Sequence, residues 1–257
     1  MVEKLDRCWR IGATGLCFSV FGTGGLLLWV TVFPLLQLMV RERRQRARLA
    51  RRIIRRGFCL FVALMRGSGV LSYEVRGAER LERRSLLVLA NHPSLVDVVF
   101  LMALIEGADC IVKGALAGNP FTRGPVRAAG FVCNDTGDTL IDDCLASLRE
   151  GGSLIIFPEG TRTPRSGSPK LQRGAARVAV RGGIDVTPVR IRVSPPTLGK
   201  GEPWWRVPAR RPHFIFEVGP DIPVQPFVDG ALEALAVRRL TDHLNTYFFL
   251  EDVRAAA

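Results

Sequence analysis

The feature that most constrains this chain is a short apolar run, Leu86 to Ala90, followed closely by a longer one, Leu95 to Ile105. The first run is typical of a strand that is buried on both faces, and the second is long enough for a buried helix. Strands covered on both faces belong to sheets with helices on either side. This pair of elements therefore predicts an α/β fold with a central, mostly parallel or mixed sheet flanked by helices.

A polar junction separates the two runs. Pro93 and Ser94 are suited to begin a helix, which would place Asp97 about one turn inside it and leave His92 at the end of the strand. The Asp97 carboxylate could then fix one imidazole tautomer, and the second ring nitrogen would be free to take a proton. Ligands of open α/β sheets bind at this end of the strands. A satisfied polar pair at a helix start is the simpler alternative.

A second strand and loop repeat this design. The apolar strand Ser153 to Phe157 is stopped by Pro158. In the following loop, Gly160 permits close backbone approach to a ligand, and Arg162 offers a planar fork for a phosphate or carboxylate. One loop with an acid/base pair and another with an anion clamp together predict a functional site.

The order and spacing of these motifs resemble those of the sequence blocks of the glycerolipid acyltransferase family. Its best known members are the 1-acylglycerol-3-phosphate acyltransferases. The likeness covers about residues 73–193, because Leu171 to Ala175 and Val186 to Val189 resemble two later blocks of the family. It implies that His92 and Asp97 are catalytic. It further implies acceptor or phosphate binding by Glu159, Gly160, Thr161 and Arg162, and donor or loop support by Asn91, Lys113 and Arg173.

One departure from the family pattern concerns the acceptor. After the strand predicted at 130–133 the family carries an arginine credited with gripping the acceptor's phosphate, whereas this chain has Asn134 and Asp135. Asparagine cannot neutralise a phosphate, and Asp135 would repel one. Two interpretations stay open: Arg123 or Arg127 supplies the charge, or the acceptor is a lyso-lipid with another head group, such as an amino-acid-linked lipid.

Residues 11–40 predict membrane attachment, because these thirty residues carry no charge and about twenty suffice for a helical span. A signal peptide is disfavoured, since no small-residue cleavage site follows and the arginines beyond would oppose translocation. Five glycines and Pro34 are expected to break up the stretch. A bent segment that dips into one leaflet therefore competes with a straight span.

The net charge of +12 is concentrated in residues 41–56, which hold nine arginines and one glutamate. Apolar residues at helical spacing predict an amphipathic helix over 41–66 that lies in the headgroup layer, apolar face down, against anionic membrane lipid. A solvated charge run that only marks the cytoplasmic side is the alternative. Nucleic-acid binding is disfavoured, because it needs no apolar leader.

These features divide the chain into a membrane-associated helical region, 1–68, and an α/β acyltransferase domain, 69–257. We expect a bacterial-type inner membrane location with the catalytic domain facing the cytoplasm. The six cysteines have neither paired spacing nor histidine companions suited to zinc, so no metal is expected.

The predicted reaction is direct acyl transfer. His92, oriented by Asp97, would take the proton of an acceptor hydroxyl as it attacks an acyl thioester, with acyl-CoA or acyl-carrier protein as donor and no further cofactor. The favoured acceptor is 1-acylglycerol-3-phosphate, which would give phosphatidate. The alternatives are a Cys133 nucleophile and a non-catalytic, membrane-bound lipid-binding protein on the same fold.

Overall fold

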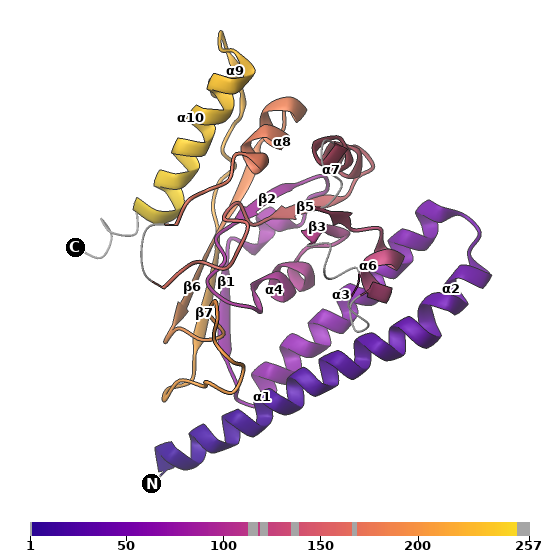
Figure 1. The fold of residues 1–257 in the computed structure, drawn as a ribbon, viewed down its shortest axis with the longest axis vertical. Coiled ribbons are helices and arrows are strands. Elements are labelled where there is room, and N and C mark those ends of the chain that lie inside the picture. Colours follow the sequence, from indigo (N-terminus) through magenta and orange to yellow (C-terminus); the bar gives the residue numbers. More distant parts are fainter. Residues whose placement is uncertain (1, 113–117, 119–122, 135–138, 166–168, 251–257) are drawn as a thin grey trace.

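The computed structural model describes residues 2–112, 118, 123–134, 139–165 and 169–250 (Figure 1). Seven strands form one sheet in the order β1-β7-β6-β2-β5-β3-β4. Only β6 and β7 pair antiparallel, and all other neighbours are parallel. The predicted α/β class with a mostly parallel sheet is therefore confirmed. The strands are β1 Ser72–Arg76, β2 Leu87–Ala90, β3 Ala108–Val112, β4 Val132–Cys133, β5 Ser153–Ile156, β6 Val186–Ser194 and β7 His213–Val218.

The apolar run from Leu86 to Ala90 forms the central strand β2, which is buried at every residue. Val88 and Ala90 face a core shared with the helices α1 (Val2–Leu27), α3 (Arg43–Gly67) and α4 (Asp97–Leu104). Leu87 and Leu89 face a second core shared with α7 (Leu140–Arg149), α8 (Gly174–Gly182) and α10 (Glu233–Asn245). Side chains alternate between the faces of a strand, so a strand covered on both sides must be apolar throughout. The helices around the sheet are α4 Asp97–Leu104, α6 Arg123–Ala129, α7 Leu140–Arg149, α8 Gly174–Gly182, α9 Gln225–Val228 and α10 Glu233–Asn245.

The N-terminal segment is helical throughout: α1 Val2–Leu27, a π-helical turn Leu28–Val32 and α2 Phe33–Met39. Within it, Glu3–Met39 is long and apolar enough to cross a membrane. The prediction that glycines and Pro34 would break it was wrong. Pro34 lies in the first turn of α2, where its missing N–H is tolerated. The wider π-helical turn Leu28–Val32 lies directly before α2, so the chain stays helical.

The basic amphipathic helix is α3 Arg43–Gly67, close to its predicted bounds. The prediction that its apolar face lies in a headgroup layer was wrong. Ile54, Phe61 and Met65 on that face are buried in the protein core. An amphipathic stripe fits an apolar protein surface as well as a lipid one, and here the other helices supply that surface. Figure 1 shows α3 running between the N-terminal helix and the sheet.

A buried arginine ties the N-terminal helix to the sheet domain. The Arg10 side chain is 1% exposed, and its guanidinium donates to the three consecutive carbonyls of residues 208–210 at 2.9, 2.6 and 3.3 Å. Its Nε donates to Asp6 at 2.9 Å. These carbonyls belong to the β6–β7 loop, residues 195–212. The same loop reaches the candidate active site.

Candidate active site

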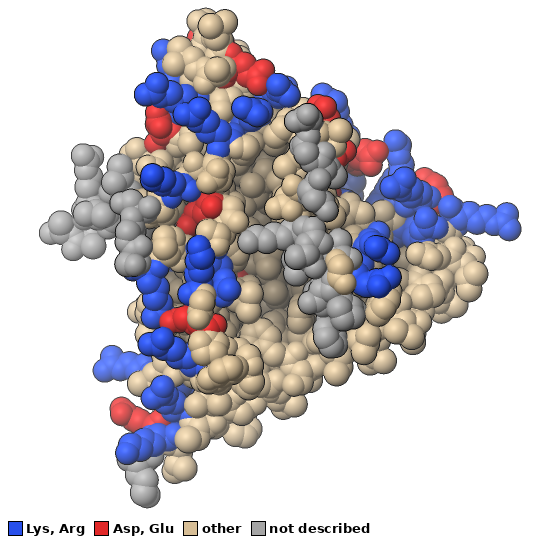
Figure 2. Space-filling view, viewed as in Figure 1, with Lys and Arg blue, Asp and Glu red and all other residues tan. Residues whose placement is uncertain are grey.

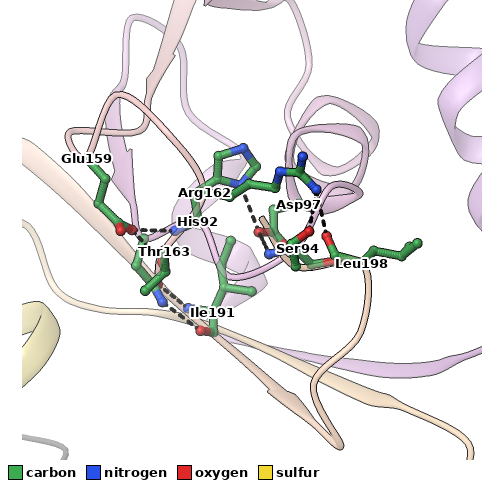
Figure 3. Close-up of polar contacts among 10 residues, drawn as sticks. His92, Ser94, Asp97, Glu159, Arg162, Thr163, Ile191 and Leu198 are labelled. Carbon is green, nitrogen blue, oxygen red and sulfur yellow. Dashed lines mark hydrogen bonds and ion pairs between the residues drawn. The ribbon is translucent and has the colours of Figure 1, made fainter. Parts of the chain in front are cut away.

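The two predicted motifs lie at the same edge of the sheet. Strands β2 and β5 are parallel neighbours, with Val88 opposite Ile155. The loops that follow their carboxyl ends therefore start side by side. The loop after β2 carries His92, and the loop after β5 carries Glu159 and Arg162. Their contacts are drawn in Figure 3.

His92 and Asp97 form a direct pair, with His92 Nδ1 2.9 Å from Asp97 Oδ2. The same oxygen accepts the backbone N–H of Ser94 at 2.6 Å. Asp97 is the first residue of α4, not one turn inside it, and Pro93 with Ser94 does not begin the helix. Ser94 to Val96 instead form a turn that the Asp97 carboxylate closes.

The imidazole is held in place and open on one side. Its ring stacks on Phe157 at 4.1 Å between centroids, and the side chain is 17% exposed. Figure 3 shows the second ring nitrogen, Nε2, directed away from Asp97. No described residue hydrogen-bonds to Nε2, so this nitrogen can meet a substrate proton.

Burial controls the charge of Asp97. The side chain is fully buried, and loss of solvation raises the pKa of Asp97 to about 6, against the opposing effect of its hydrogen bond with His92. Above that pH the carboxylate is anionic and favours the tautomer with a proton on Nδ1. The pair then has the form of a general base oriented by a carboxylate.

Glu159 fastens the two loops to each other. Its Oε1 accepts the backbone N–H of His92 at 2.8 Å and the hydroxyl of Thr163 at 2.7 Å. The backbone N–H of Thr163 in turn donates to the His92 carbonyl at 2.7 Å. Glu159 is buried, and burial raises the pKa of its carboxyl group. The acceptor role expected for Glu159 stays a prediction, because the contacts described here are internal.

These contacts lead to a stability prediction. We expect Glu159→Ala to lower the free energy of unfolding by about 1–3 kcal/mol, because it leaves a buried N–H unpaired. Glu159→Gln should cost less, since its amide oxygen can still accept both hydrogen bonds. Urea denaturation of the two variants measures the difference. Equal losses would show that Glu159 does not act through these two bonds.

Arg162 is oriented by the β6–β7 loop. Its Nη1 donates to the carbonyls of Leu198 and Gly199 at 3.0 and 2.7 Å. The Leu198 carbonyl also accepts the Leu95 N–H at 3.0 Å, which joins Arg162 to the loop of the acid/base pair. Leu198 has φ +53°, a conformation that non-glycine residues rarely adopt. Sequence reasoning missed this contribution, because Leu198 and Gly199 carry no polar side chain that would mark them.

The remaining residues of the two motifs also have defined places. Gly160 has φ +67° and is exposed at the turn, where its N–H donates to the Phe157 carbonyl at 3.0 Å. Thr161 is partly exposed beside it. The Asn91 amide donates to the Ile191 carbonyl at 2.8 Å and accepts the Ile191 N–H at 2.7 Å, which joins the end of β2 to β6.

The other predicted cations are more dispersed. The Arg123 guanidinium lies 4.7 Å from the ring centroid of Trp29 in the N-terminal helix. Arg127 is exposed on α6, and Arg173 is exposed where α8 begins. Lys113 and Asp135 lie outside the described residues. Of the arginines predicted for the site, Arg162 is therefore the one whose contacts place it beside the acid/base pair.

The site thus consists of an oriented histidine at the carboxyl ends of a mostly parallel sheet, with an arginine beside it. Residues 72–192 match the family model described as Acyltransferase. The crystal structure of the 1-acyl-sn-glycerophosphate (LPA) acyltransferase, PlsC, from Thermotoga maritima has the same fold, with a TM-score of 0.71, 19% identity and 98% of each chain covered. The matched residues are a little under half of the chain and contain both motifs, so the resemblance of these motifs to the glycerolipid acyltransferase family is confirmed.

Two curated relatives come from Pseudomonas aeruginosa. A 1-acyl-sn-glycerol-3-phosphate acyltransferase is 28% identical over 148 residues, which are 54% of this chain and 56% of the relative. A lyso-ornithine lipid O-acyltransferase is 33% identical over 132 residues, which are 50% of this chain and 51% of the relative. The chain thus matches about half the length of each.

Proposed function

We propose that this protein transfers an acyl chain from an acyl thioester to a hydroxyl group of a lyso-lipid at a membrane. The proposal is carried by the contact between His92 Nδ1 and Asp97 Oδ2, at 2.9 Å, which leaves Nε2 facing the site. Arg162, beside the pair, supplies positive charge for an anionic head group. The match of residues 72–192 to the Acyltransferase family model supports the reaction class.

The chemistry needs one base and no covalent enzyme intermediate. His92 Nε2 takes the hydroxyl proton while the acceptor oxygen forms a bond to the thioester carbonyl carbon. Collapse of the tetrahedral intermediate breaks the C–S bond, and the thiolate takes the proton back from the imidazolium. Asp97 stabilises the imidazolium between these steps. The products are the acylated lipid and the free thiol of CoA or of acyl-carrier protein.

The favoured acceptor is 1-acylglycerol-3-phosphate, which would be converted to phosphatidate. The name of the 28% identical relative and the position of Arg162 support it. A second acceptor, a lyso-ornithine lipid, is favoured by Asn134, which stands where the family carries a phosphate-gripping arginine. The 33% identity with a lyso-ornithine lipid O-acyltransferase supports that alternative.

A transfer assay on the detergent-solubilised chain tests both acceptors. Each lyso-lipid is offered with acyl-CoA and with acyl-carrier protein, and both thiol release and the acylated product, by mass spectrometry, are measured. We expect product from at least one pairing, and the preferred pairing identifies acceptor and donor. Lipid binding without thiol release from any pairing would favour the non-catalytic alternative.

We further propose that the protein sits in a bacterial-type inner membrane with its catalytic domain on the cytoplasmic side. The apolar helix Glu3–Met39 and the arginines that follow it support this orientation. Fractionation tests it, together with labelling of the exposed Cys59 by a membrane-impermeant reagent in a variant whose other exposed cysteine, Cys8, is replaced by serine. Labelling in intact spheroplasts would contradict the cytoplasmic orientation.

Arg162 gives a prediction for acceptor binding. We expect Arg162→Ala to raise the acceptor KM by about tenfold or more, with a smaller change in the donor KM, because it removes a charge-assisted contact to the head group. Arg165→Ala is a matched control in the same loop, since Arg165 is half exposed and pairs with Glu202 instead. Equal effects of the two variants, or a loss confined to kcat, would contradict this role for Arg162.

A further inference from the structure

A second charged cavity lies at the opposite edge of the sheet from His92. Its volume is about 510 Å³, and its lining includes residues 82–84, 106–107 and 151–152. These segments directly precede β2, β3 and β5, so the cavity opens at the amino ends of the same parallel strands whose carboxyl ends carry the active site. It is therefore separate from the acyl-transfer site.

Arginine dominates the lining of this cavity. Four arginines come from the first half of α3, and the others come from the segment before β2 and from the end of α7. In Figure 2, Lys and Arg side chains gather at the right-hand edge, over the start of α3, beside an uncharged face that follows the N-terminal helix. The seven arginines are Arg44, Arg48, Arg51, Arg52, Arg83, Arg84 and Arg149.

One of these arginines, Arg51, is held in position by buried groups of the protein. Arg51 Nη2 lies 2.8 Å from Asp109, a carboxylate that is 1% exposed and also accepts the Ser147 hydroxyl at 2.6 Å. Arg51 Nε donates to the Ala129 carbonyl at 2.9 Å. Its Nη1 faces Gly152, where a Cβ atom would lie 3.1 Å away. A buried anion thus holds Arg51, and the missing side chain at Gly152 leaves room beside its remaining N–H groups.

Seven arginines line the cavity against three glutamates, Glu82, Glu106 and Glu150, so its positive charge exceeds its negative charge. Arg44 pairs with Glu150 at 3.1 Å, and Arg83 pairs with Asp221 at 2.7 Å. Like charges around one cavity repel one another unless an anion lies between them. Among the residues that the structure describes, four of the seven arginines pair with no carboxylate: Arg48, Arg52, Arg84 and Arg149.

We propose that this cavity binds an anionic phosphate group. Guanidinium forks match phosphate oxygens in geometry and charge, and the volume suits a small ligand. Two sources share that chemistry, the head group of an anionic phospholipid and a soluble polyphosphate. The lipid source is favoured by Leu38 and Met39, which are 81% and 74% exposed at the end of α2, just before the first of these arginines.

Two triple variants, each lowering the net charge equally, test the site. The cavity variant is Arg48→Gln/Arg52→Gln/Arg149→Gln. The control, Arg56→Gln/Arg177→Gln/Arg239→Gln, changes exposed arginines outside the cavity lining, one of them a single turn away on α3. Each is prepared as the 257-residue chain in non-ionic detergent. Folding is checked by circular dichroism.

Thermal shift with inorganic pyrophosphate is the first measurement, because its outcome does not depend on acyl transfer. We expect the apparent Kd of the cavity variant to rise by at least about tenfold over the parent, whereas the control changes little. Equal weakening in both variants would overturn the proposal, since general surface charge would then explain binding. Absence of any pyrophosphate binding by the parent would overturn it too.

Vesicle binding identifies the source of the phosphate. Flotation is compared on phosphatidylcholine vesicles with and without phosphatidylglycerol, at constant salt. A lipid head group is supported if the cavity variant loses the phosphatidylglycerol-dependent part of flotation while the control variant keeps it. Unchanged flotation with weakened pyrophosphate binding supports a soluble phosphate. The proposal would be overturned if the parent binds no pyrophosphate and the cavity variant binds acyl-carrier protein more weakly than the parent does. The arginines would then form a docking surface for a protein.

Discussion

Replacing His92 by alanine is expected to lower the rate of acyl transfer by about 10³-fold, within the range that general bases contribute. The variant removes the nitrogen that accepts the acceptor's proton, while its backbone N–H and carbonyl keep their bonds to Glu159 and Thr163. We therefore expect the fold and membrane association to persist. Thiol release and product formation in detergent measure the effect.

His243→Ala is the matched control, because this histidine is exposed on α10, away from the site. It should transfer at the parental rate. Normal turnover by the His92 variant would contradict the proposed reaction, and an unfolded His92 variant would redirect the test to His92→Gln. That substitution keeps a polar side chain of similar size but lacks a basic nitrogen.

Asp97→Asn is expected to lower turnover by about 10²-fold or more without lowering stability at pH 7. An amide cannot stabilise the imidazolium, so the base is weakened. The buried carboxylate is costly to ionise, however, because burial raises the pKa of Asp97 from 3.8 to about 6. The neutral amide avoids that cost. Steady-state kinetics and urea denaturation at the same pH measure the two effects.

The same pKa fixes the signs of two pH dependences. Folding favours protonated Asp97, so this group's contribution to stability is complete below about pH 4 and is lost as pH rises through about 6. Activity runs the other way, because the anion is required, and kcat/KM should fall as pH drops below about 6. An Asp97→Asn variant with parental turnover would contradict the assignment.

Local patterns predicted the central part of this fold because burial imposes them locally. A strand covered on both faces must be apolar throughout, which is why β2 and β5 could be placed within a residue or two. Parallel pairing of these two strands then brings their loops together, and the motifs needed no further information. The roles proposed for the residues in those loops came from the family resemblance.

The errors arose where contacts distant in sequence decide the structure. The apolar face of α3 is equally suited to lipid and to protein, and only the docked position of α4 and the N-terminal helix determines which it meets. The start of α4 is a local exception, because the helix begins at Asp97, whose own carboxylate accepts the Ser94 N–H and closes the preceding turn. The carbonyls of Leu198 and Gly199 support Arg162 from 36 and 37 residues away, and no local pattern announces a backbone contact of that kind.

The buried Arg10 changes how the protein can be shortened. A truncation that removes the first forty residues to obtain a soluble enzyme would leave three consecutive carbonyls of the β6–β7 loop without their donor. That loop also grips Arg162 through two other carbonyls. A shortened protein should therefore lose affinity for its acceptor even in an assay that contains no bilayer, which makes the N-terminal helix a part of the enzyme and not a detachable anchor.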